Sequence, residues 1–146
     1  MTRLIRFCPI LLAGLFCPGP ADSETLAGPV SAAIERVVDG DTLAVRAHIW
    51  LGQDIRVLVR VRGIDAPEIR GRCVSEKRRA AEAARTVAAM ISERPVTLLR
   101  IEGDKYHGRV VADVRLEDGR DLGTALLQTG AARRYDGTVR AGWCAG

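Results

Sequence analysis

Carboxylates in three short polar segments are the residues of this sequence best suited to chemistry. The segments are Asp39-Gly40-Asp41-Thr42, Arg60 to Glu68, and Asp104 to Arg109. Asp41 and Asp65 offer hard oxygen ligands of the kind that calcium takes, and backbone carbonyls and waters can complete such a shell. Glu68 is a further carboxylate that is not needed as a ligand, so it can orient or deprotonate a water.

Two arginines complete this set, because Arg60 and Arg109 come from different segments and can grip one phosphate in a fork. They can also stabilise the charge of a five-coordinate phosphorus. A metal on one side, arginines on the other and a base beside the water suffice for phosphodiester hydrolysis. The clusters taken jointly therefore favour that reaction.

Each segment also has a plainer interpretation. An Asp-Gly pair between two strands is ordinarily only a turn. Carboxylates after a strand end are often solvated, and Arg60 lies on the strand face opposite Val59 and Val61, which favours exposure to solvent. His107 and His48 are more typical of surface residues than of a base or a ligand.

The elements that must position these residues are mainly strands. Period-two alternation and turn residues predict five of them, at 33–38, 42–51, 55–61, 96–101 and 110–116. Helical spacing predicts a long helix between the third and fourth strands, capped by Ser75, and a short helix over 122–128 ends at Gly130. The long helix is expected to turn a polar face to water: Glu76, Lys77, Arg78 and Glu82. We predict a mainly β fold with α, an OB-fold five-stranded antiparallel barrel with one long and one short helix.

The N-terminal residues differ from the rest of the chain. Arg3 and Arg6 precede an apolar run from Phe7 to Cys17, followed by a Pro/Gly-rich patch. This pattern predicts a signal peptide over 1–21, a linker over 22–32 and a domain over 33–146, and hence a secreted or periplasmic protein. A hydrophobic N-terminus of a cytosolic protein is the alternative. The run is too short to span a membrane, which takes about 20 residues.

Charge alone does not identify a partner. The formal net charge is +4, and two of the positive charges, Arg3 and Arg6, belong to the expected leader. A polyanion site must therefore come from local clustering of basic residues.

Cysteine usage predicts one disulfide. Without the expected leader the chain keeps Cys73 and Cys144, an even pair in an oxidising compartment. Their bond would pin the C-terminal tail to the start of the long helix, and two free thiols are the alternative. Neither these cysteines nor the two histidines have zinc-ligand spacing.

The order of the motifs resembles the staphylococcal-nuclease-like (thermonuclease) family across roughly residues 33–135. The motifs that carry the resemblance are Val38-Asp39-Gly40-Asp41-Thr42, Arg60 through Asp65-Ala66-Pro67-Glu68, and Asp104-Lys105-Tyr106-x-Gly108-Arg109. The resemblance implies an OB-fold barrel, a calcium ion and cleavage of DNA, RNA or both. It assigns the metal to Asp41, Asp65 and the carbonyl of Ala66, the general base to Glu68, and phosphate binding in catalysis to Arg60 and Arg109.

The sequence departs from the family pattern in three places. Ala66 stands where the family often has threonine, a change that a backbone ligand survives. His107 is one extra residue before Gly108-Arg109, and the tail has only Tyr135 where the family's best-known member has several tyrosines and a further helix. Lys105, Tyr106 and Tyr135 are the expected substrate-binding residues, the tyrosines by stacking on a base, although each tyrosine can equally be packed or exposed.

Two other functional classes compete with a nuclease. OB folds often bind single strands without cutting them, so a non-catalytic single-stranded nucleic-acid-binding module is the main alternative. A small structural domain held by its disulfide is the other, and it has no use for the ordered charges. We expect a monomer.

Overall fold

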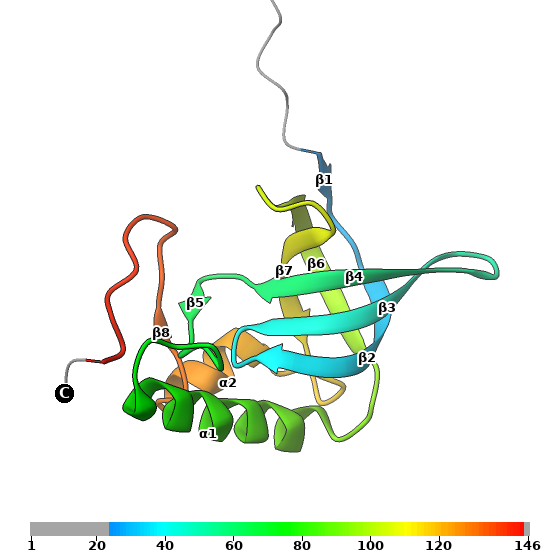
Figure 1. Cartoon of the computed structure of the whole chain (residues 1–146). Coiled ribbons are helices and arrows are strands. Elements are labelled where there is room, and N and C mark those ends of the chain that lie inside the picture. Colours follow the sequence, from blue (N-terminus) through cyan, green and yellow to red (C-terminus); the bar gives the residue numbers. More distant parts are fainter. Residues whose placement is uncertain (1–23, 145–146) are drawn as a thin grey trace, which may run out of the picture.

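Strands rolled into a closed barrel dominate the computed structural model, which describes residues 24–144 (Figure 1). The strands are β1 Thr25–Leu26, β2 Val30–Asp39, β3 Thr42–Trp50, β4 Gln53–Val61, β5 Ile64–Asp65, β6 Val96–Gly103, β7 Arg109–Arg115 and β8 Arg133–Arg134. The helices are α1 Val74–Ile91 and α2 Leu122–Gln128. The expected leader at 1–21 lies outside the described residues.

Five strands close the barrel, and β1 adds an edge strand on β6. β2, β3 and β4 form an antiparallel meander, and β6 pairs antiparallel with both β2 and β7. The predicted OB-fold barrel with a long and a short helix is thus confirmed. One detail of the prediction is wrong, because β7 runs parallel to β4, with Leu58 opposite Arg109. Parallel pairing follows from the α1 crossover between β4 and the β6–β7 hairpin.

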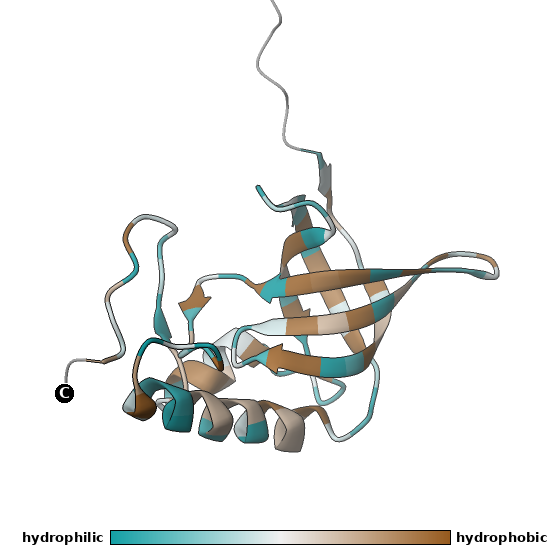
Figure 2. Ribbon diagram, viewed as in Figure 1, coloured by the Kyte–Doolittle hydropathy of each residue, from teal (hydrophilic) through white to brown (hydrophobic). Residues whose placement is uncertain are grey.

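Period-two alternation fills the barrel with aliphatic side chains. Leu43, Val45, Val59, Val61 and Val114 are almost completely buried inside it. The helices close one end of the barrel, where Val87 of α1 and Leu122 and Leu126 of α2 join the same core. Figure 2 shows the resulting pattern of brown apolar stripes on the strands and a mixed polar surface on α1.

The N-terminal boundary differs from the expectation. The segment 22–32, expected to be a linker, contributes Thr25–Leu26 to the sheet and starts β2 at Val30. These residues pair with β6, far along the chain, with Thr25 opposite Glu102 and Val30 opposite Leu98. Local composition carries no information on such a distant partner.

The start of α1 also differs from the expectation. Cys73, not Ser75, is the N-cap, and its sulfur accepts a hydrogen bond from the backbone N–H of Glu76 at 3.4 Å. Glu76 was expected to face water but is only 8% exposed. Its carboxylate instead accepts backbone N–H groups of the loop before the helix, at 3.0 Å from Arg72 and 3.5 Å from Glu68.

The β3–β4 hairpin extends well beyond the barrel as an arm (Figure 1). Its tip exposes Trp50 and Leu51, and Ile55 on the returning strand is also exposed although its alternation predicted an inward face. Ile55 is exposed because this end of β4 extends beyond the barrel. Within residues 24–144, neither helix is long and apolar enough to cross a membrane.

Candidate functional site

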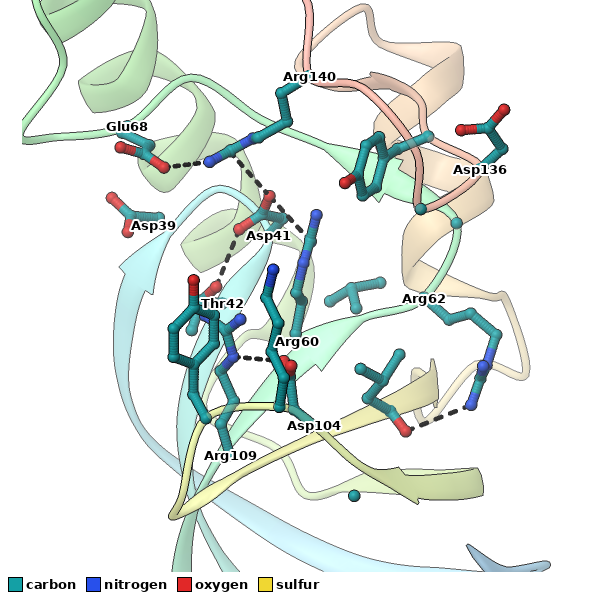
Figure 3. A pocket seen from close by; sticks show the side chains of 18 residues that line it. Asp39, Asp41, Thr42, Arg60, Arg62, Glu68, Asp104, Arg109, Asp136 and Arg140 are labelled. Carbon is teal, nitrogen blue, oxygen red and sulfur yellow. Dashed lines mark hydrogen bonds and ion pairs between the residues drawn. The ribbon is translucent and has the colours of Figure 1, made fainter. Parts of the chain in front are cut away.

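An open pocket beside the β2–β3 turn collects most of the predicted site residues (Figure 3). Asp41 comes from that turn, Arg60 from β4, Glu68 from the loop after β5, and Arg109 from the start of β7. The parallel β4–β7 pairing sets Val111 opposite Arg60 and so places both arginines on adjacent strands. Lys105, Tyr106 and Tyr135 line the same pocket.

Gly40 lets the turn that carries Asp41 come this close to its surroundings. A Cβ atom at this position would lie 2.8 Å from the Cβ atoms of both Ala66 and Ala83. Such distances are shorter than side chains tolerate, so glycine is needed here for the close approach. The turn is thereby packed between the loop after β5 and helix α1.

Asp41 is held rigidly, with its side chain only 7% exposed. Its Oδ2 accepts hydrogen bonds from Arg60 and from the backbone N–H of Ala66, both at 3.1 Å. Its Oδ1 accepts the Thr42 hydroxyl at 2.9 Å. The carboxylate is thus oriented by β4 and by the loop after β5 together.

Asp65 lies beneath the C-terminal tail and does not line the open pocket. Its side chain is 2% exposed, and Arg133 of β8 donates to its Oδ2 at 2.8 and 3.1 Å. The Trp143 indole donates to the same oxygen at 2.9 Å, while Arg140 pairs with Oδ1. Burial alone would raise the pKa of Asp65, but the hydrogen bonds from Arg140, Trp143 and Arg133 outweigh it and hold the pKa below its usual 3.8.

Arg140 reaches from the tail into the middle of the acidic residues (Figure 3). Its guanidinium pairs with Asp65 and Glu68, and its terminal nitrogen lies 3.4 Å from the carbonyl oxygen of Ala66 and 3.9 Å from Oδ2 of Asp41. Burial would lower the pKa of Arg140, but the bonds to the two carboxylates raise it, so the side chain stays charged. Arg140 was not among the predicted site residues.

Glu68 lies at the mouth of the pocket, with its side chain 46% exposed. Solvent can therefore reach its carboxylate, as a general base requires. Asp39, which was not among the predicted site residues, is its neighbour and accepts the backbone N–H of Ile69 at 2.9 Å. Burial raises the pKa of Asp39, the negative charges of Asp41 and Glu68 raise it further, and the Ile69 hydrogen bond offsets part of the increase.

The two predicted arginines are oriented by different partners. Arg60 donates to Asp41 and, at 3.1 Å, to the backbone carbonyl of Ile64. The Nε of Arg109 donates to Asp104 at 2.6 Å, and this pair lowers the pKa of Asp104 against the opposing effect of burial. Because only Nε is engaged among the described residues, the terminal nitrogens of Arg109 remain available to an anion in the pocket.

The expected substrate-binding residues surround these arginines. Tyr106 is 55% exposed, and the Arg109 guanidinium carbon lies 4.5 Å from its ring centroid, with Lys105 Nζ at 5.2 Å. The ring centroid of Tyr135 lies 5.3 Å from the guanidinium carbon of Arg60. Both rings therefore lie where a base next to a bound phosphate could stack.

The oxygen ligands expected to bind a metal already converge on a positive charge. Oxygens of Asp41, Asp65 and Ala66 all face the Arg140 guanidinium. These are hard donors of the type that calcium takes, and the guanidinium acts as a stand-in cation among them. The residues present thus fit a divalent cation.

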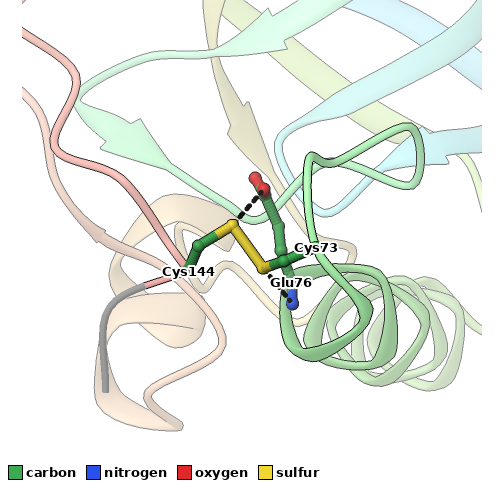
Figure 4. A group of neighbouring side chains, drawn as sticks. All are labelled: Cys73, Glu76 and Cys144. Carbon is green, nitrogen blue, oxygen red and sulfur yellow. Dashed lines mark hydrogen bonds between the residues drawn. A yellow bond between two sulfur atoms is a disulfide. The ribbon is translucent and has the colours of Figure 1, made fainter.

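The predicted disulfide joins Cys73 and Cys144, whose Cα atoms are 5.9 Å apart (Figure 4). Glu76 lies beside it, with its Oε2 3.5 Å from the sulfur of Cys144. The ligand atoms of these three side chains lie within 4.8 Å of one another, a spacing that a metal ion could bridge. The cluster is not a metal site, because disulfide sulfurs are not thiolates and Glu76 is engaged by backbone N–H groups.

Sequence reasoning missed Arg133, Arg140 and Trp143. No strand was predicted in the tail, yet Arg133–Arg134 pairs with β5 as strand β8. The predicted disulfide was the available clue, because it ties Cys144 close to the loop that carries Glu68. A tail pinned there must pass over the acidic residues, and Arg140 is four positions before Cys144.

Two comparisons with known proteins bear on this geometry. The family model described as "Staphylococcal nuclease homologue" matches residues 58–141, which include the end of β4, both helices and most of the tail. No curated protein matches the chain. The matched segment covers more than half of the chain and holds Arg60, Asp65, Glu68 and Arg109 on an OB-fold barrel. The chain therefore belongs to the staphylococcal nuclease homologue family.

Proposed function

We propose that this protein is a calcium-dependent nuclease that hydrolyses phosphodiester bonds of DNA, RNA or both. Family membership supports a nuclease-type or nucleic-acid-binding domain. The observation that carries the finer proposal is the pocket in Figure 3, where Asp41, Glu68 and two arginines from adjacent strands face one solvent-accessible space. A binding surface alone does not need a carboxylate among its phosphate-binding groups.

The metal ligands in this proposal are Asp41, Asp65 and the carbonyl oxygen of Ala66. Bound there, calcium would supply positive charge next to the phosphate. The chain itself orients the first of these donors, because Arg60 and the backbone N–H of Ala66 fix the Asp41 carboxylate. Asp65 and Ala66 follow each other on β5 and its loop.

The remaining steps belong to the side chains of the pocket. Glu68 accepts a proton from a water, whose oxygen attacks phosphorus in line with the bond to the leaving oxygen. Arg60 and Arg109 bind the non-bridging phosphate oxygens and offset the negative charge that grows on them as that bond breaks. Tyr106 and Tyr135 hold the adjacent bases.

The first experiment follows digestion of single-stranded DNA and of RNA by the purified, oxidised protein in calcium and in excess chelator. Glu68→Gln keeps the size of the side chain but removes its basicity, so we expect a fall in kcat of roughly 10²–10⁴-fold. Glu82→Gln is the matched control, since Glu82 is an exposed residue on α1 away from the pocket. A Glu68→Gln protein as active as the control would eliminate Glu68 as the base.

A non-catalytic single-stranded binding module is the second candidate. The observation that favours it is the pairing of Arg140 with Glu68 and Asp65, which neutralises the acidic residues in the conformation described. Such a module shifts intact DNA on a gel in chelator and in calcium alike. Digestion that requires calcium and Glu68 excludes it.

We further propose that the protein is exported and acts as a monomer. Export is supported by the sequence pattern of residues 1–21 and by the disulfide, since disulfides persist in oxidising compartments. A monomer suffices for the proposed reaction, because a single chain supplies every side chain that the proposal uses.

A further inference from the structure

The position of Arg140 suggests a function that the nuclease proposal does not use. Its guanidinium contacts all three donors assigned to the metal and the carboxylate assigned as base: Asp41, Asp65, Ala66 and Glu68. The side chain comes from the far C-terminal tail, 75 positions after Asp65. An arginine that only stabilised the tail would not need to reach every one of these groups.

The tail that carries Arg140 is fastened on both sides of it. Before it, β8 pairs with β5, and Arg133 binds Asp65 with two nitrogens. After it, the Trp143 indole donates to Asp65 and lies against Arg133, 4.1 Å from ring centroid to guanidinium carbon. The Cys73–Cys144 bond then fixes the end of this segment covalently. A tether of this kind gives Arg140 a high effective concentration at the acidic residues.

A guanidinium and a calcium ion cannot share this position. A calcium ion lies about 2.3–2.6 Å from each oxygen ligand. The Arg140 nitrogen that lies 3.4 Å from the Ala66 oxygen faces the same space. An ion bound to that oxygen and to Asp65 would meet a positive charge within contact distance. The arginine must therefore leave before the ion can bind.

We propose that Arg140 is a built-in competitor for the divalent-cation site, and that the disulfide-tethered tail sets the apparent affinity of the site for calcium. This inference rests on the proposed calcium site. In the closed form Arg140 neutralises the carboxylates and also occupies Glu68. In the open form Arg140 has withdrawn from the donor oxygens, so the apparent dissociation constant is the intrinsic one divided by the open fraction.

Calcium binding measured by titration calorimetry tests the competition without relying on activity. Arg140→Gln removes the competing charge, and we expect its apparent calcium affinity to exceed that of the wild type by about 10-fold or more, as a closed fraction of 90% or above requires. Arg134→Gln is the matched control. It removes one positive charge from the same tail, but Arg134 makes no ion pair within the part of the chain that the structure describes. Its affinity should stay within about 2-fold of the wild type.

Movement of the tail can be followed through Trp143. The chain has only two tryptophans, so Trp50→Phe at the exposed arm leaves Trp143 as the sole indole. We expect calcium to change Trp143 fluorescence at the same concentrations at which it binds. Cys73→Ser with Cys144→Ser loosens the tether and should tighten calcium binding, provided circular dichroism shows an unchanged fold. If that variant does not fold, Arg140→Gln decides.

The outcomes separate this inference from the function on which it rests. Equal calcium affinity in wild type, Arg140→Gln and Arg134→Gln overturns the competition and leaves the calcium-dependent nuclease intact. Weaker binding by Arg140→Gln also overturns it, because Arg140 would then support the site. No calcium binding by any of the three proteins overturns both proposals. Tighter binding by Arg140→Gln alone supports both.

Discussion

At the scale of single residues, Arg109 shows how one partner can prepare a side chain for a substrate. Asp104 holds its Nε at 2.6 Å and Tyr106 lies against its guanidinium, which leaves the terminal nitrogens directed to the pocket. Lysine cannot form this fork, because its ammonium is a single point charge. We therefore expect Arg109→Lys to lower kcat/KM by roughly 10²-fold or more. Steady-state kinetics on a DNA oligonucleotide measure the loss, and Arg115→Lys at the far end of β7 is the control. Equal rates for the two variants would contradict a phosphate-binding role.

The lowered pKa of Asp65 predicts how the free energy of unfolding depends on pH. Its folded pKa lies below 3.8, because Arg140, Trp143 and Arg133 stabilise the carboxylate. Above 3.8 the group is ionised in both states and its contribution to stability is complete. As the pH falls below 3.8 the unfolded chain takes up the proton first, so the contribution declines until the lower folded pKa is passed.

Urea unfolding between pH 7 and pH 2.5 measures this contribution. We expect Asp65→Asn to be less stable at pH 7 and to lose less stability on acidification than the wild type. Some acid dependence remains, because the pKa of Asp104 is also lowered in the fold. The exposed Asp54→Asn serves as control. If the free energy of unfolding of Asp65→Asn fell with pH as steeply as that of the wild type, Asp65 would not be the source of the acid dependence.

At the scale of elements, the β2–β3 turn depends on the close approach of Gly40 to Ala66 and Ala83. We expect Gly40→Ala to lower the free energy of unfolding by about 1–3 kcal/mol, as overpacking generally does. The added methyl group would push the turn away from Ala66 and Ala83, and this shift of Asp41 should weaken calcium binding. Gly103→Ala is the control, since a Cβ there meets open space and its φ is not positive. Denaturant unfolding compares the two, and equal stability would mean that the turn relaxes freely.

At the scale of the whole molecule, the disulfide links two distant parts of the chain. It closes a loop of 71 positions between the start of α1 and the tail. Loss of the bond frees the unfolded chain and should lower the free energy of unfolding by about 2–4 kcal/mol. Urea unfolding with and without a thiol reductant measures this, and the Cys73→Ser, Cys144→Ser protein should not respond to the reductant. An unchanged wild-type midpoint would show that the cystine does not restrain the unfolded chain.

Local patterns in the sequence determined most of the elements. The alternation of β4 and the helical spacing of α1 follow from which face of each element is buried, and α2 begins and ends where expected, at Leu122–Gln128. The three motifs also contain many of the residues that line the pocket, among them Asp41, Arg60 and Arg109. Period and motif order are properties of neighbouring residues, so one sequence suffices to read them.

Only the tertiary structure decided the contacts between distant segments. The parallel β4–β7 pairing, the β1–β6 pairing and the contact of Glu76 with Cys144 all depend on partners far along the chain. So does the capture of the acidic residues by Arg140 from 75 positions away. The sequence by itself determined which residues could hold a cation, because carboxylates and carbonyls have that chemistry in any fold. The path of the tail decided which cation they meet, because a long-range ion pair forms only where folding brings its two ends together.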